Sequence, residues 1–265
     1  MSQRRSLSRR TFLKVTAGTG AGLVLGCYAK PDTQVASAKG RAELTPSAWL
    51  RIGEVGLATV TISKSDMGQG ARTTLATIVA EELGVAWEDV RIEQADGNPE
   101  RYGSQTTGGS GSVRSMWTPL RMTGATARTM LIAAAAQKWG VAVEQCRVEN
   151  GKVLHSGPGR ELTFGELVAA AATMPVPERS AVKLKDPSEY TLVGKEIGRV
   201  DAPDIVQGKA LYGFDVHIPG MRYAVIERAP AFGARVKTVR DAEALAVPGV
   251  RKVLQVPTGV AVVGD

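Results

Sequence analysis

Cysteine and histidine are scarce in this 265-residue chain, which contains two of each. Cys27 lies in a basic leader and Cys146 stands alone in the remainder, so a chain that loses the leader cannot form an internal disulfide. The same scarcity excludes an iron–sulfur or zinc cluster held by cysteines of this chain alone. His155 and His217 stand far apart without the spacing of metal ligands, and we interpret both as surface or turn residues.

Basic charge is also scarcer than the formal net charge of +7 suggests. Five basic residues lie within the first 14 positions, where no acid occurs, so the rest of the chain carries a net charge of only +2. The other Lys and Arg residues are interspersed with acids, which argues against nucleic acid as a partner. Although only 5% of residues are aromatic, the 43% hydrophobic content is sufficient for the core of one or two domains.

The first 38 residues are typical of an export signal followed by a linker. The segment Ser8-Arg9-Arg10-Thr11-Phe12-Leu13-Lys14 precedes an uncharged stretch over 15–25, which is the pattern of a twin-arginine signal. That stretch is much shorter than the ~20 residues a membrane-spanning helix needs. We therefore expect the Tat translocase to export this chain to the periplasm. A basic tail without a signal function is the alternative.

Two processing sites are compatible with this leader. Ala36-Ser37-Ala38 has the small-x-small form of a signal peptidase site. Val24-Leu25-Gly26-Cys27 resembles a lipobox, in which Cys27 would carry a lipid. Lipidation of Cys27 or an uncleaved leader would keep the protein attached to the membrane, so the sequence leaves both a free and an attached form open.

The body of the chain has the pattern of an α+β protein. A linker is expected over 28–46. Apolar spacing then predicts a strand, a helix, a second strand and a second, longer helix, over residues 57–64, 75–83, 90–94 and 113–138. Pro119 is expected to kink the longer helix or divide it in two.

Turn signals organise the second half. Asn150-Gly151 predicts a hairpin between strands over 146–149 and 152–155, and Thr163 with Glu166 forms a capping box for a helix that ends near Ala172. A connector follows over 175–207. From Gly208 onward we expect short strands, Pro-Gly turns and a short helix over 241–246, with a domain boundary at about residue 200. The chain stops on an apolar strand over 259–263, which we expect to be left unpaired in a fragment of a longer protein.

Two glycine-rich segments each stand just before a predicted helix, Asp66–Gly70 and Thr106–Ser112. Glycine lets the backbone approach a ligand closely, and the N–H groups at a helix N-terminus attract anions. The Gln69 amide could in addition bind the edge of a heterocycle, and the hydroxyls of the second segment add donors. Together the segments predict one extended anionic ligand that is bound at two places.

These segments resemble the large subunit of molybdenum hydroxylases, the xanthine dehydrogenase and aldehyde oxidase superfamily. The resemblance rests on Asp66-Met67-Gly68-Gln69-Gly70 with the helix end Ala80–Leu83, and on the Gly108–Ser112 loop continued by Val113-Arg114-Ser115. The branch resembled is the isoquinoline 1-oxidoreductase β-subunit type, which also carries a twin-arginine leader. The stretch from Gly208 to Met221 resembles the start of the superfamily's hammerhead α/β domain. This implies a signal and linker over 1–38, part of a molybdopterin-binding region over 45–200 and a truncated hammerhead domain over 201–265.

The resemblance also implies a cofactor, a reaction and partners. The cofactor would be molybdenum-molybdopterin cytosine dinucleotide, and an aldehyde or N-heterocycle would be hydroxylated at carbon with oxygen from water. Electrons would leave through a separate small [2Fe–2S] subunit, with a cytochrome as a candidate acceptor. Carried over residue by residue, the cofactor-binding candidates are Gly68, Gln69, Gly70, Gly108, Gly109, Ser110, Gly111 and Ser112.

The chain departs from the family pattern in one respect. The family's base is a glutamate near the end of a chain several times longer, and nothing here corresponds to it. We therefore assign no catalytic residue or metal ligand, and we expect this chain to be inactive alone. Glu81, Glu82 and Glu166 are interpreted as structural residues of helices or caps. Two other hypotheses remain: an exported non-catalytic binding protein or lipoprotein for a phosphate-bearing ligand, and a structural protein whose glycines only form turns.

Overall fold

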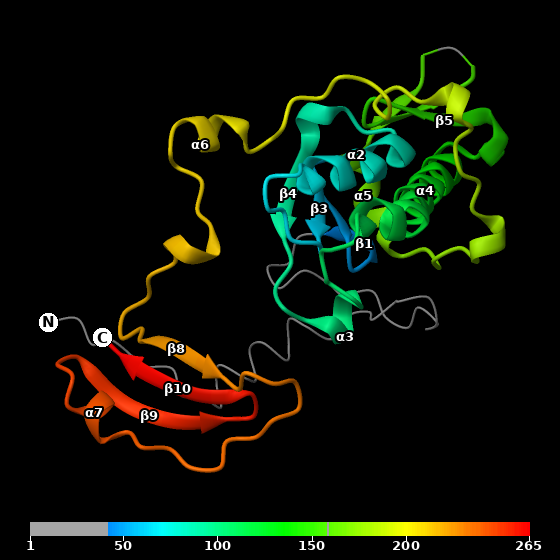
Figure 1. Ribbon diagram of the computed structural model, residues 1–265. Coiled ribbons are helices and arrows are strands. Elements are labelled where there is room, and N and C mark those ends of the chain that lie inside the picture. The colour runs from blue at the N-terminus through cyan, green and yellow to red at the C-terminus, as the bar shows by residue number, and fades with distance from the viewer. Residues whose placement is uncertain (1–41, 158) are drawn as a thin grey trace, which may run out of the picture. The chain divides into compact units, whose positions relative to one another are not determined.

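The computed structural model of the chain describes residues 42–157 and 159–265 (Figure 1). The twin-arginine segment, the two processing sites and Cys27 lie outside these residues. The chain separates into two compact units between Ala202 and Pro203. The sequence placed a domain boundary at about residue 200. Within the part that is described, no helix is both long and apolar enough to cross a membrane. The predicted α+β class is confirmed.

A four-stranded sheet forms one layer of the first unit. Its strands, in sheet order, are β1 (Glu43–Ser47), β2 (Leu50–Gly53), β3 (Ala58–Ile62) and β4 (Val90–Gln94). The first three strands are antiparallel neighbours, whereas β3 and β4 are parallel. The predicted linker over 28–46 is wrong at its end, because β1 begins at Glu43 and buries Leu44. Its short polar sequence, with Pro46 inside, hid a strand that tertiary packing stabilises.

Two long helices pack against each other beside this sheet (Figure 1). They are α2 (Ala71–Leu83), which connects β3 to β4, and α4 (Gly111–Trp139). The helices approach closely at Gly124, where an added Cβ would lie 2.5 Å from the carbonyl oxygen of Val79. Gly124 is therefore needed for packing, since a side chain there would force the helices apart.

The helix α4 runs through Pro119 without a break, so the alternative in which Pro119 divides it is wrong. A proline inside a helix costs about 3 kcal/mol through the lost hydrogen bond and the clash with the preceding turn. Residues on both sides of it are buried, including Met116, Leu120 and Leu131, and this burial offsets the cost. A kink at Pro119 stays a prediction.

A second, three-stranded sheet follows α4. It consists of β5 (Cys146–Glu149), β6 (Lys152–His155) and β7 (Glu161–Thr163), with β6 in the centre. The predicted hairpin is confirmed: Asn150 and Gly151 have φ values of 48° and 75°, as a tight two-residue hairpin turn requires. The capping box is confirmed as well, and it begins α5 (Phe164–Ala172), which packs on β1, β2 and α4. The strand β7 was not expected.

Short elements complete the first unit. They are the helix α3 (Pro99–Tyr102), between β4 and α4, and the 3₁₀ turns η1 (Trp87–Asp89), η2 (Val143–Gln145), η3 (Arg179–Ala181) and η4 (Pro187–Glu189). The connector after α5 is attached to α2 through two buried carboxylates. Glu82 accepts hydrogen bonds from Arg121 and from the backbone N–H of Lys185, and Glu81 accepts one from the Lys185 side chain.

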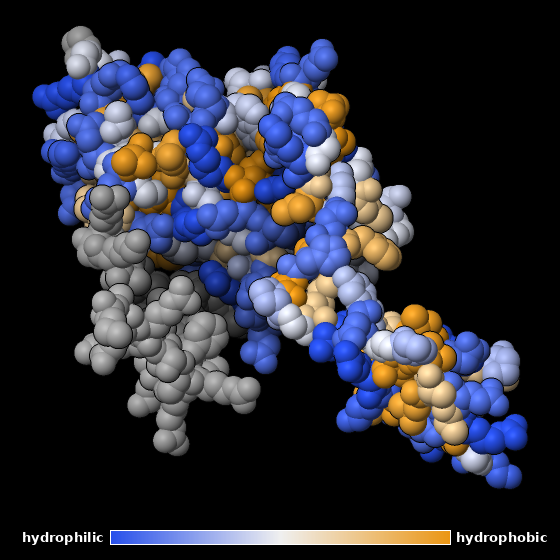
Figure 2. Space-filling model, turned by 90° about the vertical axis from the view of Figure 1, so that its left-hand side faces the viewer, coloured by the Kyte–Doolittle hydropathy of each residue, from blue (hydrophilic) through white to orange (hydrophobic). Residues whose placement is uncertain are grey.

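The second unit contains an antiparallel sheet of three strands, β8 (Tyr223–Arg228), β9 (Val250–Val256) and β10 (Gly259–Gly264). The expectation that the last strand is unpaired is wrong, because β10 is central and pairs with β8 and β9 on its two sides. Its apolar sequence suits a central strand. The remaining elements are α6 (Ala202–Val206), which begins at the boundary, the 3₁₀ turn η5 (Gly213–Asp215) and α7 (Ala242–Leu245). Large apolar side chains remain exposed on this unit, among them Phe214, Val225 and Phe232 (Figure 2).

Candidate functional site

The two glycine segments meet at one edge of the first sheet. Since β3 and β4 are parallel and in register from Ala58 and Val90 to Ile62 and Gln94, the segments that follow them leave the same edge. In sheets with parallel strands, ligands bind beyond the carboxyl ends of the strands. The Thr107 hydroxyl donates a 3.0 Å hydrogen bond to the carbonyl of Ser65 and so joins the segments directly.

The first segment forms a tight turn around Asp66. Gly68 and Gly70 have φ values of 103° and 84°, which favour glycine. One carboxylate oxygen of Asp66 accepts a 2.8 Å hydrogen bond from the N–H of Gly68, and the other accepts one of 2.9 Å from the N–H of Arg72 in the first turn of α2. The anion at the start of α2 is thus Asp66 itself. This removes the physical basis for expecting a ligand anion at that helix end.

Gln69 folds back on its own turn. Its Oε1 accepts a 2.6 Å hydrogen bond from the N–H of Met67, and its Nε2 donates one of 3.1 Å to the carbonyl of Ser65. A primary amide has two donor hydrogens and two acceptor lone pairs, so one of each remains for a ligand. The side chain is exposed and can present these remaining groups to a heterocycle at the sheet edge.

The second segment is open where the first is closed. Gly109 and Ser110 have φ values of 54° and 52°, and α4 starts after Ser110 with no side-chain cap and no acid in its first turn. The first N–H groups of a helix have no partner within the helix, so these groups and the helix dipole favour an anion here. A Cβ added at Gly108, Gly109 or Gly111 would meet nothing within 4 Å among the residues described. Packing therefore does not require these glycines.

Ser112 differs from the other candidates in this segment. It is a buried residue, whereas Gly108, Gly109 and Ser110 are exposed. Its hydroxyl is therefore not offered at the surface with the rest of the loop. The open part of the segment runs from Gly108 to Ser110, because the N–H of Gly111 donates a 3.0 Å hydrogen bond to the carbonyl of Gly108.

Sequence reasoning missed two residues that hold these segments in place. Lys64 is only 5% exposed, and its Nζ donates hydrogen bonds to the carbonyls of Ser104 (2.6 Å) and Thr106 (3.2 Å). Arg199, in the connector, donates to the carbonyl of Gly68 and binds Asp201 at 2.7 Å. Its hydrogen bond to Asp201 lowers the pKa of that carboxyl. Only the position of Lys64, between a strand and a glycine turn, could have drawn attention to it from sequence.

Glu81, Glu82 and Glu166 have the structural roles that the sequence analysis assigned to them. Burial raises the pKa of Glu81, but hydrogen bonds from Lys185 and from the backbone N–H groups of Leu192 and Val193 outweigh it and leave the pKa lowered. Glu82 is fully buried, and Glu166 accepts from the N–H of Thr163 at 2.8 Å. Over residues 42–157 and 159–265, no group of three or more His, Cys, Asp or Glu side chains could hold a metal ion.

The two histidines and Cys146 also have local roles. His155 accepts a hydrogen bond from the N–H of Gly157 at 3.1 Å, and His217 lies 2.9 Å from the hydroxyl of Tyr223. Burial raises the pKa of the Cys146 thiol, which makes it a poor nucleophile. His217 is exposed, in agreement with its interpretation as a turn or surface residue. For His155 that interpretation is wrong, because it is the half-buried last residue of β6 and its Nε2 is buried.

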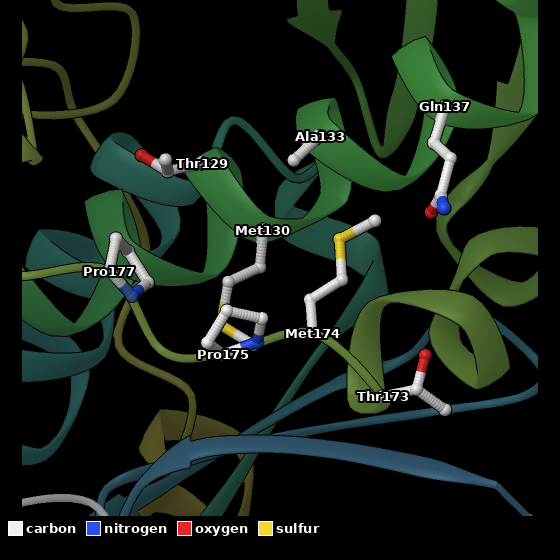
Figure 3. A pocket seen from close by; sticks show the side chains of 8 residues that line it. All are labelled: Thr129, Met130, Ala133, Gln137, Thr173, Met174, Pro175 and Pro177. Atoms are coloured by element: carbon white, nitrogen blue, oxygen red, sulfur yellow. The ribbon is translucent and has the colours of Figure 1, made fainter.

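A mostly apolar pocket of the first unit is separate from the glycine segments. It has a volume of about 440 Å³ and lies between α4 and the residues after α5, with Met130, Met174 and Pro175 pointing into it (Figure 3). None of its lining residues is charged and none belongs to either glycine segment. A smaller pocket of about 180 Å³ includes Thr73 and Thr74 of α2 and Trp117 of α4.

A parallel strand pair followed by glycine turns at helix starts is an arrangement at which proteins bind phosphate-bearing ligands. The chain belongs to the molybdopterin cofactor-binding domain family, whose model matches residues 3–217. The resemblance to molybdenum hydroxylases, of the isoquinoline 1-oxidoreductase β-subunit type, is thereby confirmed.

Two curated proteins and one solved structure are similar to this chain. The isoquinoline 1-oxidoreductase subunit beta of Brevundimonas diminuta is 37% identical over 302 residues, which cover 97% of this chain and 38% of that protein. The membrane-bound aldehyde dehydrogenase (pyrroloquinoline-quinone) of Gluconacetobacter polyoxogenes is 34% identical over 93% of this chain and 33% of its own length. The crystal structure of quinoline 2-oxidoreductase from Pseudomonas putida 86 has a TM-score of 0.39 and 33% identity, over 47% of this chain and 16% of that one. The chain thus spans little more than a third of the curated relatives it matches.

The open glycine segment fits part of a molybdopterin cofactor. Its glycines leave free space, and the start of α4 presents donors without a competing acid in its first turn. These are the features that a phosphate group requires. The first segment fits a different part, because Asp66 already accepts from its N–H groups and Gln69 retains one donor and one acceptor. It suits an uncharged ring edge rather than a second phosphate.

Proposed function

We propose that this chain is part of the molybdopterin-binding subunit of an exported molybdenum hydroxylase. The observation that carries this proposal is the contact between the two glycine segments at the edge of β3 and β4, with the start of α4 left open. Family membership supports it as well. The names of the relatives, an isoquinoline oxidoreductase and an aldehyde dehydrogenase, favour an N-heterocycle or an aldehyde as the substrate.

In this proposal each segment has a separate task. The backbone N–H groups of Gly108, Gly109 and Ser110 bind a phosphate of the cofactor, and Gln69 binds the edge of a ring. When bound, the molybdenum cofactor supplies the redox centre at which a carbon is hydroxylated with oxygen from water. The residues of this chain orient that cofactor and neutralise its charge, and no acid or base of the described residues is assigned to the reaction.

The finer assignments belong to the same proposal. We take the cofactor to be the cytosine dinucleotide form, and the partners to be a small [2Fe–2S] subunit and a cytochrome acceptor. The leader Ser8–Lys14 would direct export by the Tat translocase after the cofactor has been inserted in the cytoplasm. Replacing Arg9 and Arg10 by lysine is expected to keep the protein in the cytoplasm, as cell fractionation would show; unchanged export would contradict the Tat assignment.

The test of the function compares two glycines of one loop. Gly108 and Gly97 are both exposed, both lack a positive φ, and a Cβ at either would meet nothing within 4 Å. Gly108→Val should therefore cost no more stability than Gly97→Val, yet only Gly108→Val would fill the proposed phosphate site. Full-length protein from a host that makes the cofactor is analysed for molybdenum and for cytidine monophosphate released by acid. We expect both to be near one per wild-type subunit, and both to fall about tenfold in Gly108→Val.

Three outcomes would count against the proposal. Wild-type protein without molybdenum would favour the non-catalytic binding protein. Molybdenum without cytidine monophosphate would overturn the dinucleotide form alone. Equal contents in Gly108→Val and Gly97→Val would show that the glycine loop is only a turn.

A further inference from the structure

A buried lysine lies beneath the loop that leads to the open glycine segment. Lys64 follows β3, is 5% exposed, and makes no ion pair with any acid of the described residues. Lysine is rarely buried without a paired charge, because taking an ammonium group out of water is costly. Burial of the Lys64 ammonium group therefore destabilises the folded chain, which suggests that the group has a function at this place.

The hydrogen bonds of Lys64 all go to one stretch of backbone. Its Nζ donates to the carbonyls of Ser104 and Thr106, which lie four and two residues before Gly108. Between these carbonyls and Gly108, the Thr107 hydroxyl binds the carbonyl of Ser65. The stretch from Ser104 to Thr107 thus has three attachments to the residues that follow β3. It has no helix or strand of its own that could fix its path.

The position of the open segment depends on these attachments. Gly108 to Ser110 are exposed, and a Cβ at Gly108 or Gly109 would meet nothing within 4 Å, so the backbone on their two sides defines where they lie. The stretch before them is held by the attachments above, and after them the N–H of Gly111 donates to the carbonyl of Gly108 at 3.0 Å. The ammonium group also leaves a positive charge, without a paired carboxylate, under the loop that approaches the start of α4. In a buried site such a charge is weakly screened and favours an anion nearby.

We propose that Lys64 is the positioning residue of the Gly108–Ser112 loop and that its charge supports anion binding there. The positional part stands on the contacts alone, and the anion part rests on the proposed function. Sequence motifs and family membership assign no role to Lys64. Lys185 is a matched control, because it is also a largely buried lysine that donates to the protein interior, but its partner is Glu81.

The experiment uses full-length protein and two readouts. Hydrogen–deuterium exchange follows the backbone of residues 104–112, and molybdenum and cytidine monophosphate are counted per subunit. Lys64→Met keeps the length of the side chain and removes its donors and charge. We expect exchange over 104–112 to rise about tenfold while α5 and the β5–β6 hairpin keep their protection, with cofactor content at least about fivefold lower. Lys185→Met should leave exchange in 104–112 and cofactor content unchanged.

Each outcome decides a separate claim. Unchanged exchange over 104–112 in Lys64→Met would overturn the positioning role. Faster exchange with unchanged cofactor content would overturn the role in anion binding alone. If wild-type protein holds no cofactor but the loop still responds, the proposed function fails and the positioning role stands. Should Lys64→Met not fold, Lys64→Gln is measured instead, since its shorter, uncharged side chain removes the ammonium group from the two carbonyls. Faster exchange over 104–112 than in wild type then supports the positioning role, and unchanged exchange overturns it.

Discussion

Two helices of the first unit begin in opposite ways. The helix α5 starts with a complete capping box: Thr163 accepts from the N–H of Glu166, and Glu166 accepts from the N–H of Thr163. The helix α4 starts at exposed glycines with no side-chain cap. Gly165 at the start of α5 is packed so closely that an added Cβ would lie 2.1 Å from the carbonyl oxygen of Glu54, whereas Gly108 before α4 faces open space.

This difference separates a helix start that the protein closes itself from one that it leaves open. The protein itself satisfies the free N–H groups at the start of α5, so nothing remains there for a ligand. The start of α4 lacks a side-chain cap that would stabilise it. Close packing does not require the glycines before it. Where a sequence keeps a helix start open at a cost in stability, function is the usual cause. The start of α2 lies between the two, because Asp66 supplies the anion.

Alanine at the two glycines should give the largest contrast. Gly165→Ala must displace backbone and is expected to destabilise the first unit by about 1–3 kcal/mol or more. Gly108→Ala meets no atom, so its effect should stay within about 0.5 kcal/mol. Urea unfolding of both variants measures the difference. Similar losses at the two positions would contradict the assignment of Gly108 to an open site.

The caps should give a smaller contrast. Thr163→Ala removes the oxygen that accepts from the N–H of Glu166 and is expected to cost about 1 kcal/mol. Ser110→Ala removes a hydroxyl without a capping bond and should change stability by less than about 0.5 kcal/mol. Thermal unfolding of the two variants checks this. A large loss in Ser110→Ala would mean that its hydroxyl caps α4 after all.

The smallest expected effect is a dependence of helix-start stability on pH, which α5 should show and α4 should not. The N–H of Thr163 and then its hydroxyl lower the pKa of Glu166 below the ordinary value of 4.5. A lowered carboxyl pKa contributes stability that is complete above the unfolded value and is lost as the pH falls through the folded one. Protection of the amides in the first turn of α5, measured against their intrinsic exchange rate at each pH, should therefore fall below about pH 4.5. The fall should be larger in the wild type than in Glu166→Gln. The first turn of α4 has no acid and serves as the internal reference.

Sequence reasoning succeeded where a signal is contained in a few neighbouring residues. The hairpin at Asn150-Gly151 and the capping box at Thr163 are examples, since turn chemistry and capping are decided within four residues. It failed where packing outweighs a local preference. Pro119 lies inside an unbroken α4, and β1 forms across Pro46. In each case buried neighbours compensate for a residue that is unfavourable locally.

The two glycine segments also show which features are local and which depend on tertiary structure. The sequence by itself determined that two glycine runs stand before two helices, because glycine content and helix spacing are local properties. Only the tertiary structure decided that they share one edge, because that follows from the parallel pairing of β3 with β4, residues about 30 positions apart. It also decided which helix start is free. Asp66 closes α2, Lys64 supports the loop before α4, and both depend on contacts that side chains make only in the folded chain.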